Sequence, residues 1–186
     1  MGYAVVSEFD GEYAVHDSGY RSVPKKEDEP YGEYRHRIMD YWIHEFPYMV
    51  EQAQKAVSPC ELVCVSETIP AKGSGNFAAA GQSELVKTAI TTCQVLAHQM
   101  GVQWREIASS TIRKQVFGKA SKPPKNNGKK RRKVTKVDMR NAVSHVFPHI
   151  VEGRVWLDDL QPDEIDGIAV GLTAVGFNRR RYDKGV

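Results

Sequence analysis

The stretch PDEIDGIAVGLTAVGF at residues 162–177 carries most of the information about the fold. Pro162 suits the first position of a helix, and we expect a helix over about 162–178. From position 165 to position 177 only Asp166 and Thr173 are polar, and a helix that is apolar all round is normally buried. The sequence therefore predicts a buried helix near the C-terminus that carries a carboxylate.

Strands and helices alternate in the sequence before this helix. An Asp-Gly turn between two apolar runs predicts a β-hairpin over residues 1–23. Two short apolar runs bounded by turn residues indicate buried strands, at 61–67 and 102–108. Periodicity and capping residues predict four further helices, over 33–57, 76–99, 110–117 and 135–146. This alternation predicts an α/β fold in which helices cover a sheet.

Two details of these helices are open to a direct check. Pro47 lies inside the first of them and should kink it or split it in two. The periodicity of the second helix predicts that five residues face inward: Val86, Ile90, Cys93, Leu96 and Ala97.

The length of 186 residues and the 41% of hydrophobic residues suit one domain with its own core. We expect this domain over 1–178, with a basic loop at 118–134 and a basic C-terminal tail at 179–186. No run approaches the roughly 18 apolar residues that a membrane span needs, and the N-terminus lacks the features of a signal peptide. Three cysteines, an odd count, favour a reducing compartment, so we expect a cytoplasmic protein with no membrane partner.

The net charge of +3 hides a strong segregation along the chain. Residues 113–136 hold eleven Lys and Arg and no Asp or Glu, and removing them from the total of 26 leaves 15 basic against 23 acidic residues, a net charge of −8. We call residues 113–136 the basic segment. Its charge density favours contact with phosphates through counterion release, although a solvated loop or a nuclear import signal would have the same composition.

Three carboxylates form a candidate metal site. Asp163 and Asp166 lie one turn apart on one face of the last helix, and Glu67 ends the strand at 61–67. Carboxylate oxygens are the ligands that Mg²⁺ prefers, and paired ions of this kind hydrolyse phosphodiesters. Each carboxylate could also have a purely structural role: Asp163 could favour the helix N-terminus, Asp166 could form a buried salt bridge, and Glu67 could simply mark where a strand leaves the core.

The order of these motifs resembles the RuvC family of Holliday junction resolvases. Residues 2–6 resemble the second strand of the family, T-G-Y-x-V-I, and residues 63–67 resemble the strand that ends in a catalytic Glu. Gly81-Gln82 matches a Gly-Gln in the following helix. Residues 111–119, followed by Lys136-Val137, are similar to a basic stretch, and residues 163–172 resemble the last catalytic motif, D/H-x-x-D-A-x-A-x-A.

The resemblance implies an RNase H-like mixed sheet flanked by helices. It implies metal ligands at Glu67, Asp163 and Asp166, and lysines that contact phosphate or stabilise the transition state at Lys114 and Lys136. Enzymes of this family are Mg²⁺-dependent endonucleases with two ions, for which Mn²⁺ can substitute. They are usually homodimers that nick two strands of a four-way junction in a bacterial or phage-infected cytoplasm. The expected partner is therefore branched DNA, with contacts at Arg113, Lys114, Lys119, Lys129, Lys130, Arg131, Arg132, Lys133 and Lys136.

The sequence departs from the family at its start. The first strand of the family, I-L-G-I-D-P-G, supplies a fourth ligand Asp, whereas this chain begins at the Gly-Tyr of the next strand. Neither Asp10 nor Asp17 can replace that residue, because both lie beyond the strand. We therefore expect unpaired backbone groups on both neighbours of the missing strand, and impaired activity of the chain as written. We also expect Met1 to be an internal residue of a longer protein, or the chain to be truncated.

Two further differences concern DNA recognition. The basic loop between Gly118 and Lys136 is longer than the family spacing, and Thr68-Ile69-Pro70 stands where bacterial enzymes carry an aromatic residue that stacks on junction bases. Two alternative functions remain: a degenerate nuclease that binds DNA without cutting it, and an interaction protein whose basic cluster at 129–133 is an import signal.

Overall fold

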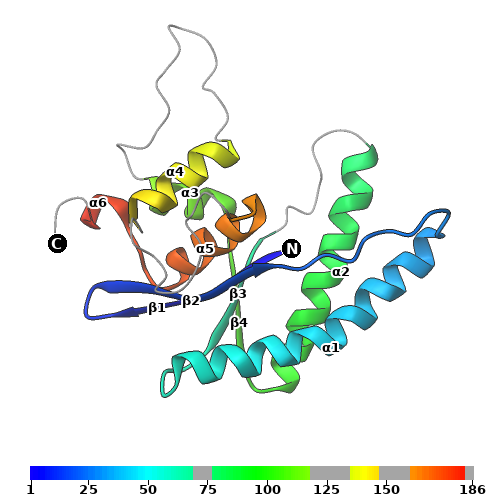
Figure 1. Ribbon diagram of the computed structural model, residues 1–186, viewed down its shortest axis with the longest axis horizontal. Helices are drawn as coiled ribbons and strands as arrows, with labels where there is room; N and C mark the ends of the chain where they lie inside the picture. The colour runs from blue at the N-terminus through cyan, green and yellow to red at the C-terminus, as the bar shows by residue number, and fades with distance from the viewer. Residues whose placement is uncertain (69–76, 118–134, 147–159, 183–186) are drawn as a thin grey trace, which may run out of the picture. The chain divides into compact units, whose positions relative to one another are not determined.

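A computed structural model describes residues 1–68, 77–117, 135–146 and 160–182, and Figure 1 shows the order of the elements. The chain divides into two compact units, of which the first is Met1–Tyr20 with Ile107–Val186 and the second is Arg21–Glu106. No helix in the described ranges is long and apolar enough to cross a membrane.

The first unit begins with the predicted hairpin. Strand β1 (Gly2–Phe9) pairs antiparallel with β2 (Glu12–Tyr20). Asp10 and Gly11 form the turn with φ values of 53° and 83°, the left-handed conformation that an Asp-Gly hairpin turn requires. The register shifts between Val5 and Val6, because Val5 lies opposite position 17 and Val6 opposite position 15, so His16 is an extra residue in β2.

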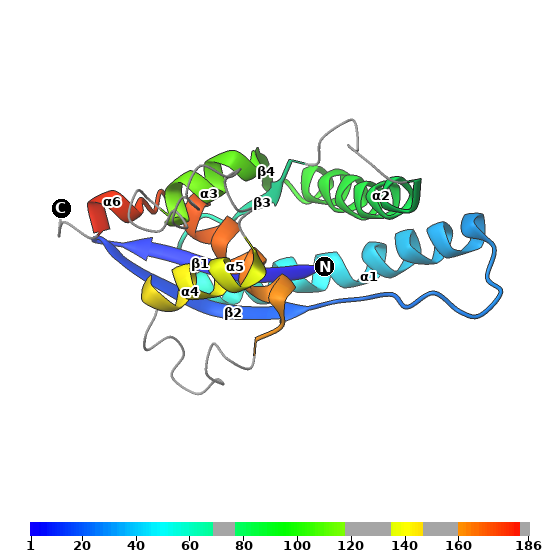
Figure 2. The same cartoon turned by 90° about the horizontal axis from the view of Figure 1, so that it is seen from above.

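Helix α5 (Pro162–Ala174) lies at the centre of this unit. It contacts both strands of the hairpin, α3 (Ser109–Phe117) and α4 (Lys136–Val146), and Figure 2 shows it running over the hairpin beside α4. The prediction of a buried helix is confirmed for its apolar side, where Ile165, Ile168, Ala169 and Leu172 are at most 1% exposed. Asp166 is only half-buried, which corrects our expectation, because it lies at the edge of this apolar side, about 60° round the helix from Ala169.

The helix ends earlier than position 178 because a glycine terminates it. Gly176 has a φ of 83°, and its N–H donates to the carbonyl of Thr173. The N–H of Phe177 donates to the carbonyl of Leu172 at 2.9 Å. These two bonds form a Schellman motif, which satisfies the last carbonyls of the helix and turns the chain.

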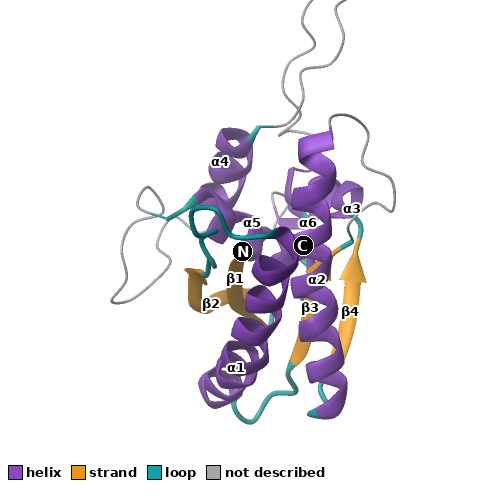
Figure 3. Ribbon diagram, turned by 90° about the vertical axis from the view of Figure 1, so that its right-hand side faces the viewer, coloured by secondary structure: helices purple, strands orange, loops and turns teal. Residues whose placement is uncertain are grey.

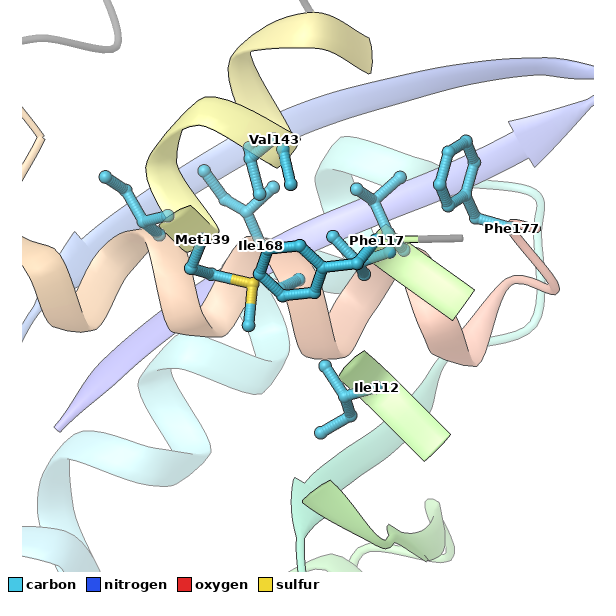
Figure 4. Packing of buried hydrophobic residues seen from close by; sticks show 11 residues of the cluster. Ile112, Phe117, Met139, Val143, Ile168 and Phe177 are labelled. Atoms are coloured by element: carbon cyan, nitrogen blue, oxygen red, sulfur yellow. The ribbon is translucent and has the colours of Figure 1, made fainter. Parts of the chain in front are cut away.

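The core of the first unit lies between α3, α4, α5 and the hairpin (Figure 4). Phe177 is fully buried and meets the ring of Tyr13 edge-on, with 5.3 Å between the centroids. Arg179 begins the short helix α6 (Arg179–Tyr182) and is 6% exposed, so the first residue of the predicted basic tail has a buried side chain. The buried cluster is Ile112, Val116, Phe117, Met139, Ala142, Val143, Ile165, Ile168, Ala169, Leu172 and Phe177.

The second unit contains α1 (Tyr31–Val57), β3 (Val63–Glu67), α2 (Phe77–Gln99) and β4 (Gln103–Ile107). Figure 3 shows α1 and α2 side by side, and the two helices contact each other. Helix α1 buries a row of large residues and α2 a row of small ones, which suits close packing of two helices. These rows are Ile38, Trp42, Phe46 and Val50 on α1, and Ala89, Cys93 and Ala97 on α2.

Two sequence-based expectations for these helices can be compared with the structure. Pro47 does not split α1, because the proline deprives only the carbonyl of Ile43 of its partner, and Ile43 lies on the exposed side of the helix. The alternative expectation, a kink at Pro47, stays a prediction. On α2 the predicted inward positions of Cys93 and Ala97 are confirmed, and Ile90 and Leu96 are half-buried. Val86 was predicted wrongly, because it is 45% exposed and Ala89 begins the buried row.

The strands pair in two separate sheets. Within the described ranges β1 pairs with β2 and β3 pairs with β4, and no pairing joins the two sheets. The architecture is therefore mixed α/β, as expected, but these four strands do not form one continuous sheet. The expectation that a central strand is missing stays a prediction.

Candidate functional site

The start of α5 holds the two predicted carboxylates. Asp163 and Asp166 are both half-buried and lie one turn apart. Glu164 has a different task, because its carboxylate accepts the backbone N–H of Gln161 at 2.9 Å and the Gln161 side chain caps the helix in return. Pro162 occupies the first turn, as predicted. The helix start is thus fixed locally by residues other than the proposed ligands.

The first turn of α5 lies directly against the start of β1. A Cβ atom at Gly2 would stand 1.7 Å from the carbonyl oxygen of Asp163. One turn further, a Cβ at Gly167 would stand 3.0–3.1 Å from the backbone of Tyr3. Backbone therefore meets backbone at both points, and side chains larger than hydrogen do not fit at Gly2. The sequence pattern did not reveal this role of Gly2, which depends on a contact across 161 positions of the chain.

The peptide that precedes the helix cap is held from another helix. Arg140 of α4 donates from Nη2 to the carbonyl oxygen of Leu160 at 3.0 Å. Behind α5, Arg179 donates from Nη1 to the carbonyl of Ala142 at 3.4 Å. Helix α4 is thereby linked to the chain before and after α5. Sequence reasoning missed Arg140, since its partner is a backbone carbonyl and leaves no side-chain motif.

Helix α4 begins where the basic segment ends. Thr135 and Asp138 form reciprocal bonds: the Thr135 N–H donates to Asp138 Oδ2 at 2.7 Å, and the Asp138 N–H donates to Thr135 Oγ1 at 3.2 Å. The predicted cap at Thr135 is confirmed. Lys136 follows it in the first turn of α4. The basic segment therefore leads into a helix start that two reciprocal bonds hold in place.

Only part of the basic segment belongs to the described residues. Arg113 and Lys114 are exposed on α3, whereas Ile112, Val116 and Phe117 of the same helix are buried. The apolar side of α3 therefore anchors the helix in the core and leaves these two cations facing water. Lys136 also belongs to the described residues. The other predicted DNA contacts lie outside them, and these are Lys119, Lys129, Lys130, Arg131, Arg132 and Lys133.

Glu67 is exposed and is the last residue of β3, in the second unit. That Glu67 shares one metal site with Asp163 and Asp166 stays a prediction. Among the described residues no group of three or more His, Cys, Asp and Glu side chains is arranged to hold a metal. Even without Glu67, the Asp163–Asp166 pair offers hard oxygen donors. Mg²⁺ is commonly held by one or two carboxylates together with water and substrate oxygens. The donor chemistry of the pair thus fits this ion.

Two of the three cysteines, Cys64 and Cys93, are thiols with limited access to water. Burial raises the pKa of the Cys64 thiol to about 11 and that of Cys93 to about 12. Both side chains therefore remain protonated thiols at neutral pH, and a protonated thiol is neither a good nucleophile nor a metal ligand.

No protein-family model matches the sequence, and no curated protein matches it either. Among solved structures, the chain is similar to the RuvC structure from Thermus thermophilus, with a TM-score of 0.52 and 13% sequence identity. The likeness covers 100% of this chain and 97% of that chain. At this level of identity the match shows the fold alone, so the chain has a RuvC-like fold.

Proposed function

We propose that this protein is a metal-dependent endonuclease that resolves four-way junctions or other branched DNA. One observation carries the proposal: two half-buried carboxylates, Asp163 and Asp166, stand at the capped start of the central helix in a RuvC-like fold. Glu67 is proposed as the third ligand. Two Mg²⁺ ions, or Mn²⁺ in their place, would supply charge stabilisation and an activated water for phosphodiester hydrolysis.

The chain's own residues would bind and orient the DNA. Arg113 and Lys114 are anchored by the buried side of α3 and face water, where phosphates can reach them. Lys114 and Lys136 are proposed to neutralise charge that develops on the reacting phosphate. The rest of the basic segment would hold the backbone of DNA without reading its sequence. The proposal includes one RNase H-like domain made of both units, a homodimer and a cytoplasmic location.

The test is nicking of a synthetic four-way junction in the presence of Mg²⁺. The assay uses the chain as it stands and a version that carries a RuvC-type first strand ahead of Met1. In whichever of these two versions nicks the junction, Asp166→Asn should abolish the activity, because a neutral amide of nearly the same size replaces a charged ligand. If Asp166→Asn retains full activity, the assignment of α5 is wrong.

Asp10→Asn is the matched control for this substitution. Asp10 is exposed in the hairpin turn with a φ of 53°, a conformation that asparagine adopts as readily as aspartate. Gly2, at one end of β1, touches Asp163, whereas Asp10 follows the opposite end of that strand. The control makes the same chemical change and should leave nicking unchanged.

A second function, DNA binding without cleavage, has its own supporting observation. The described residues contain no complete ligand group for a metal, and the two sheets are not joined by a strand in those ranges. This alternative predicts salt-dependent binding to the junction and no nicking by either version of the protein. Nicking by the version with the added strand would reject it.

A further inference from the structure

We propose that Arg140 is a positioning residue for the Asp163–Asp166 pair. Arg140 and Glu164 hold the same peptide unit: Arg140 donates to the carbonyl of Leu160 at 3.0 Å, and Glu164 accepts the N–H of Gln161 at 2.9 Å. This peptide comes immediately before the helix cap. The inference rests on the proposed function, because it concerns how the proposed metal ligands are placed.

A peptide that is held on both polar sides cannot rotate about its axis. The plane of this peptide fixes the direction in which the chain enters Gln161. The carbonyl oxygen of Gln161 in turn accepts the first hydrogen bonds of the helix, from the N–H of Glu164 at 2.9 Å and from that of Ile165 at 3.3 Å. Asp163 follows only two positions after Gln161. The orientation of the first turn, and of the carboxylates that it carries, therefore depends on the plane that Arg140 helps to set.

The two holders of this peptide differ in origin. Glu164 belongs to α5 itself and moves with it, whereas Arg140 belongs to α4, which Thr135 and Asp138 cap at its own start. Of these two hydrogen-bonding groups, Arg140 is therefore the one that ties the peptide to a part of the unit outside α5. Its bond joins a guanidinium ion to a carbonyl in a half-buried place, and such charge-assisted bonds are stronger than neutral ones.

Below the helix, β1 limits movement in the other direction. Gly2 lies so close to the carbonyl of Asp163 that a Cβ would stand 1.7 Å from it. Loss of the Arg140 bond would thus let the first turn pivot over β1. Groups that hydrogen-bond a metal ligand directly change metal affinity by about 10–100-fold when they are replaced, and Arg140, which acts through the backbone, should have an effect at the lower end of this range.

The experiment compares Arg140→Met and Arg140→Lys with the unmodified full chain. Mn²⁺ is titrated while the paramagnetic broadening of the backbone amide signals of residues 163–167 is followed by NMR. Arg140→Met should weaken the apparent Mn²⁺ affinity by about tenfold. Arg140→Lys should restore most of it, since an ammonium ion can also donate to a carbonyl. The Cα shifts of residues 163–167 without metal should change in Arg140→Met and return toward the original values in Arg140→Lys.

A merely structural role of Arg140 predicts a different result. Arg140→Met would then lower the melting temperature. Well below that temperature, however, its Mn²⁺ affinity and its Cα shifts would equal those of the unmodified chain. This result would overturn the proposal. Arg105→Met is the control, because Arg105 is exposed in β4 and bonds only locally, to Gln103 at 2.8 Å. It should alter none of the readouts.

The two proposals fail in different ways. If the unmodified chain shows no Mn²⁺-dependent broadening at residues 163–167, the metal pair and the proposed function fall. The metal-free Cα shifts still decide whether Arg140 orients the helix start. If the unmodified chain binds Mn²⁺ there and Arg140→Met binds it equally well, the role of Arg140 falls while the proposed function stands.

Discussion

Replacing Gly2 with alanine should displace the start of α5 and with it Asp163. The new Cβ would lie 1.7 Å from the carbonyl oxygen of Asp163 and 2.1 Å from its carbonyl carbon. Ordinary van der Waals contact begins at 3.4 Å, so the two backbones have to separate by about 1.7 Å at this point. No flexible side chain can yield in their place, because the three nearest atoms all belong to backbone.

Two opposing effects decide the sign of the stability change. Overpacking of this kind costs about 1–3 kcal/mol, whereas alanine in a strand is favoured over glycine by about 0.5–1 kcal/mol. The steric effect is the larger, and we expect a net loss of about 1–2 kcal/mol. For a chain of this size, that corresponds to a melting temperature lower by about 3–6 °C. Misplacement of a reacting group by about 1 Å can cost 10²-fold in rate, and we expect a loss of junction nicking of that order.

The assay measures thermal unfolding and initial nicking rates side by side, with the substitution made in whichever of the two versions of the protein nicks the junction. The matched control is Gly32→Ala in α1, where a Cβ meets nothing within 4 Å and alanine should stabilise the helix by up to about 1 kcal/mol. If Gly2→Ala melts at the original temperature and nicks at the original rate, the close approach of α5 to β1 does not exist as described.

Three further predictions concern the core, an ion pair and DNA binding. Phe177→Ala should lower the free energy of unfolding by about 3–5 kcal/mol in a denaturant titration, because the ring is fully buried. Arg37 hydrogen-bonds the carboxylate of Glu29 and lowers its pKa to about 2, so Glu29 stabilises the fold above pH 4.5 and loses this contribution as the pH falls toward 2. Arg37→Met should return the pKa of Glu29, followed by NMR, toward 4.5. Lys114→Gln should reduce the slope of log K against log salt for junction binding by about 0.9, if Lys114 contacts one phosphate.

Local chemistry explains which elements could be predicted. The hairpin turn follows from Asp10-Gly11, since both residues adopt positive φ values. The start of α4 follows from Thr135, whose hydroxyl accepts a backbone N–H within the same turn. Each of these signals needs only neighbours a few positions away, so the sequence contains all of the interacting groups.

Long-range packing explains what could not be predicted. The exposure of Val86 depends on which part of α2 meets α1: the periodic pattern predicted the buried Cys93 and Ala97 correctly, but not that the buried row begins at Ala89. Arg140 bonds a backbone carbonyl 20 positions away, which any residue type could provide. The carboxylates of α5 could be identified from their spacing, but their half-buried state depends on how the strands and helices surround that helix.

The glycines between α5 and β1 also suggest how distant relatives could be recognised. Gly2, Gly167 and Gly171 each lie where a Cβ would meet the partner element at 3.1 Å or less. Most core positions accept several hydrophobic residues of similar volume, so they can diverge until overall identity carries no signal. Positions 2, 167 and 171 have less freedom, because a Cβ would meet backbone at the first two and the side chain of Val6 at the third. A glycine that opens a hairpin, followed far along the chain by D-x-x-D and then a small residue, Gly or Ala, at the first and fifth positions after it, is therefore a more durable search pattern for chains of this kind than their overall similarity.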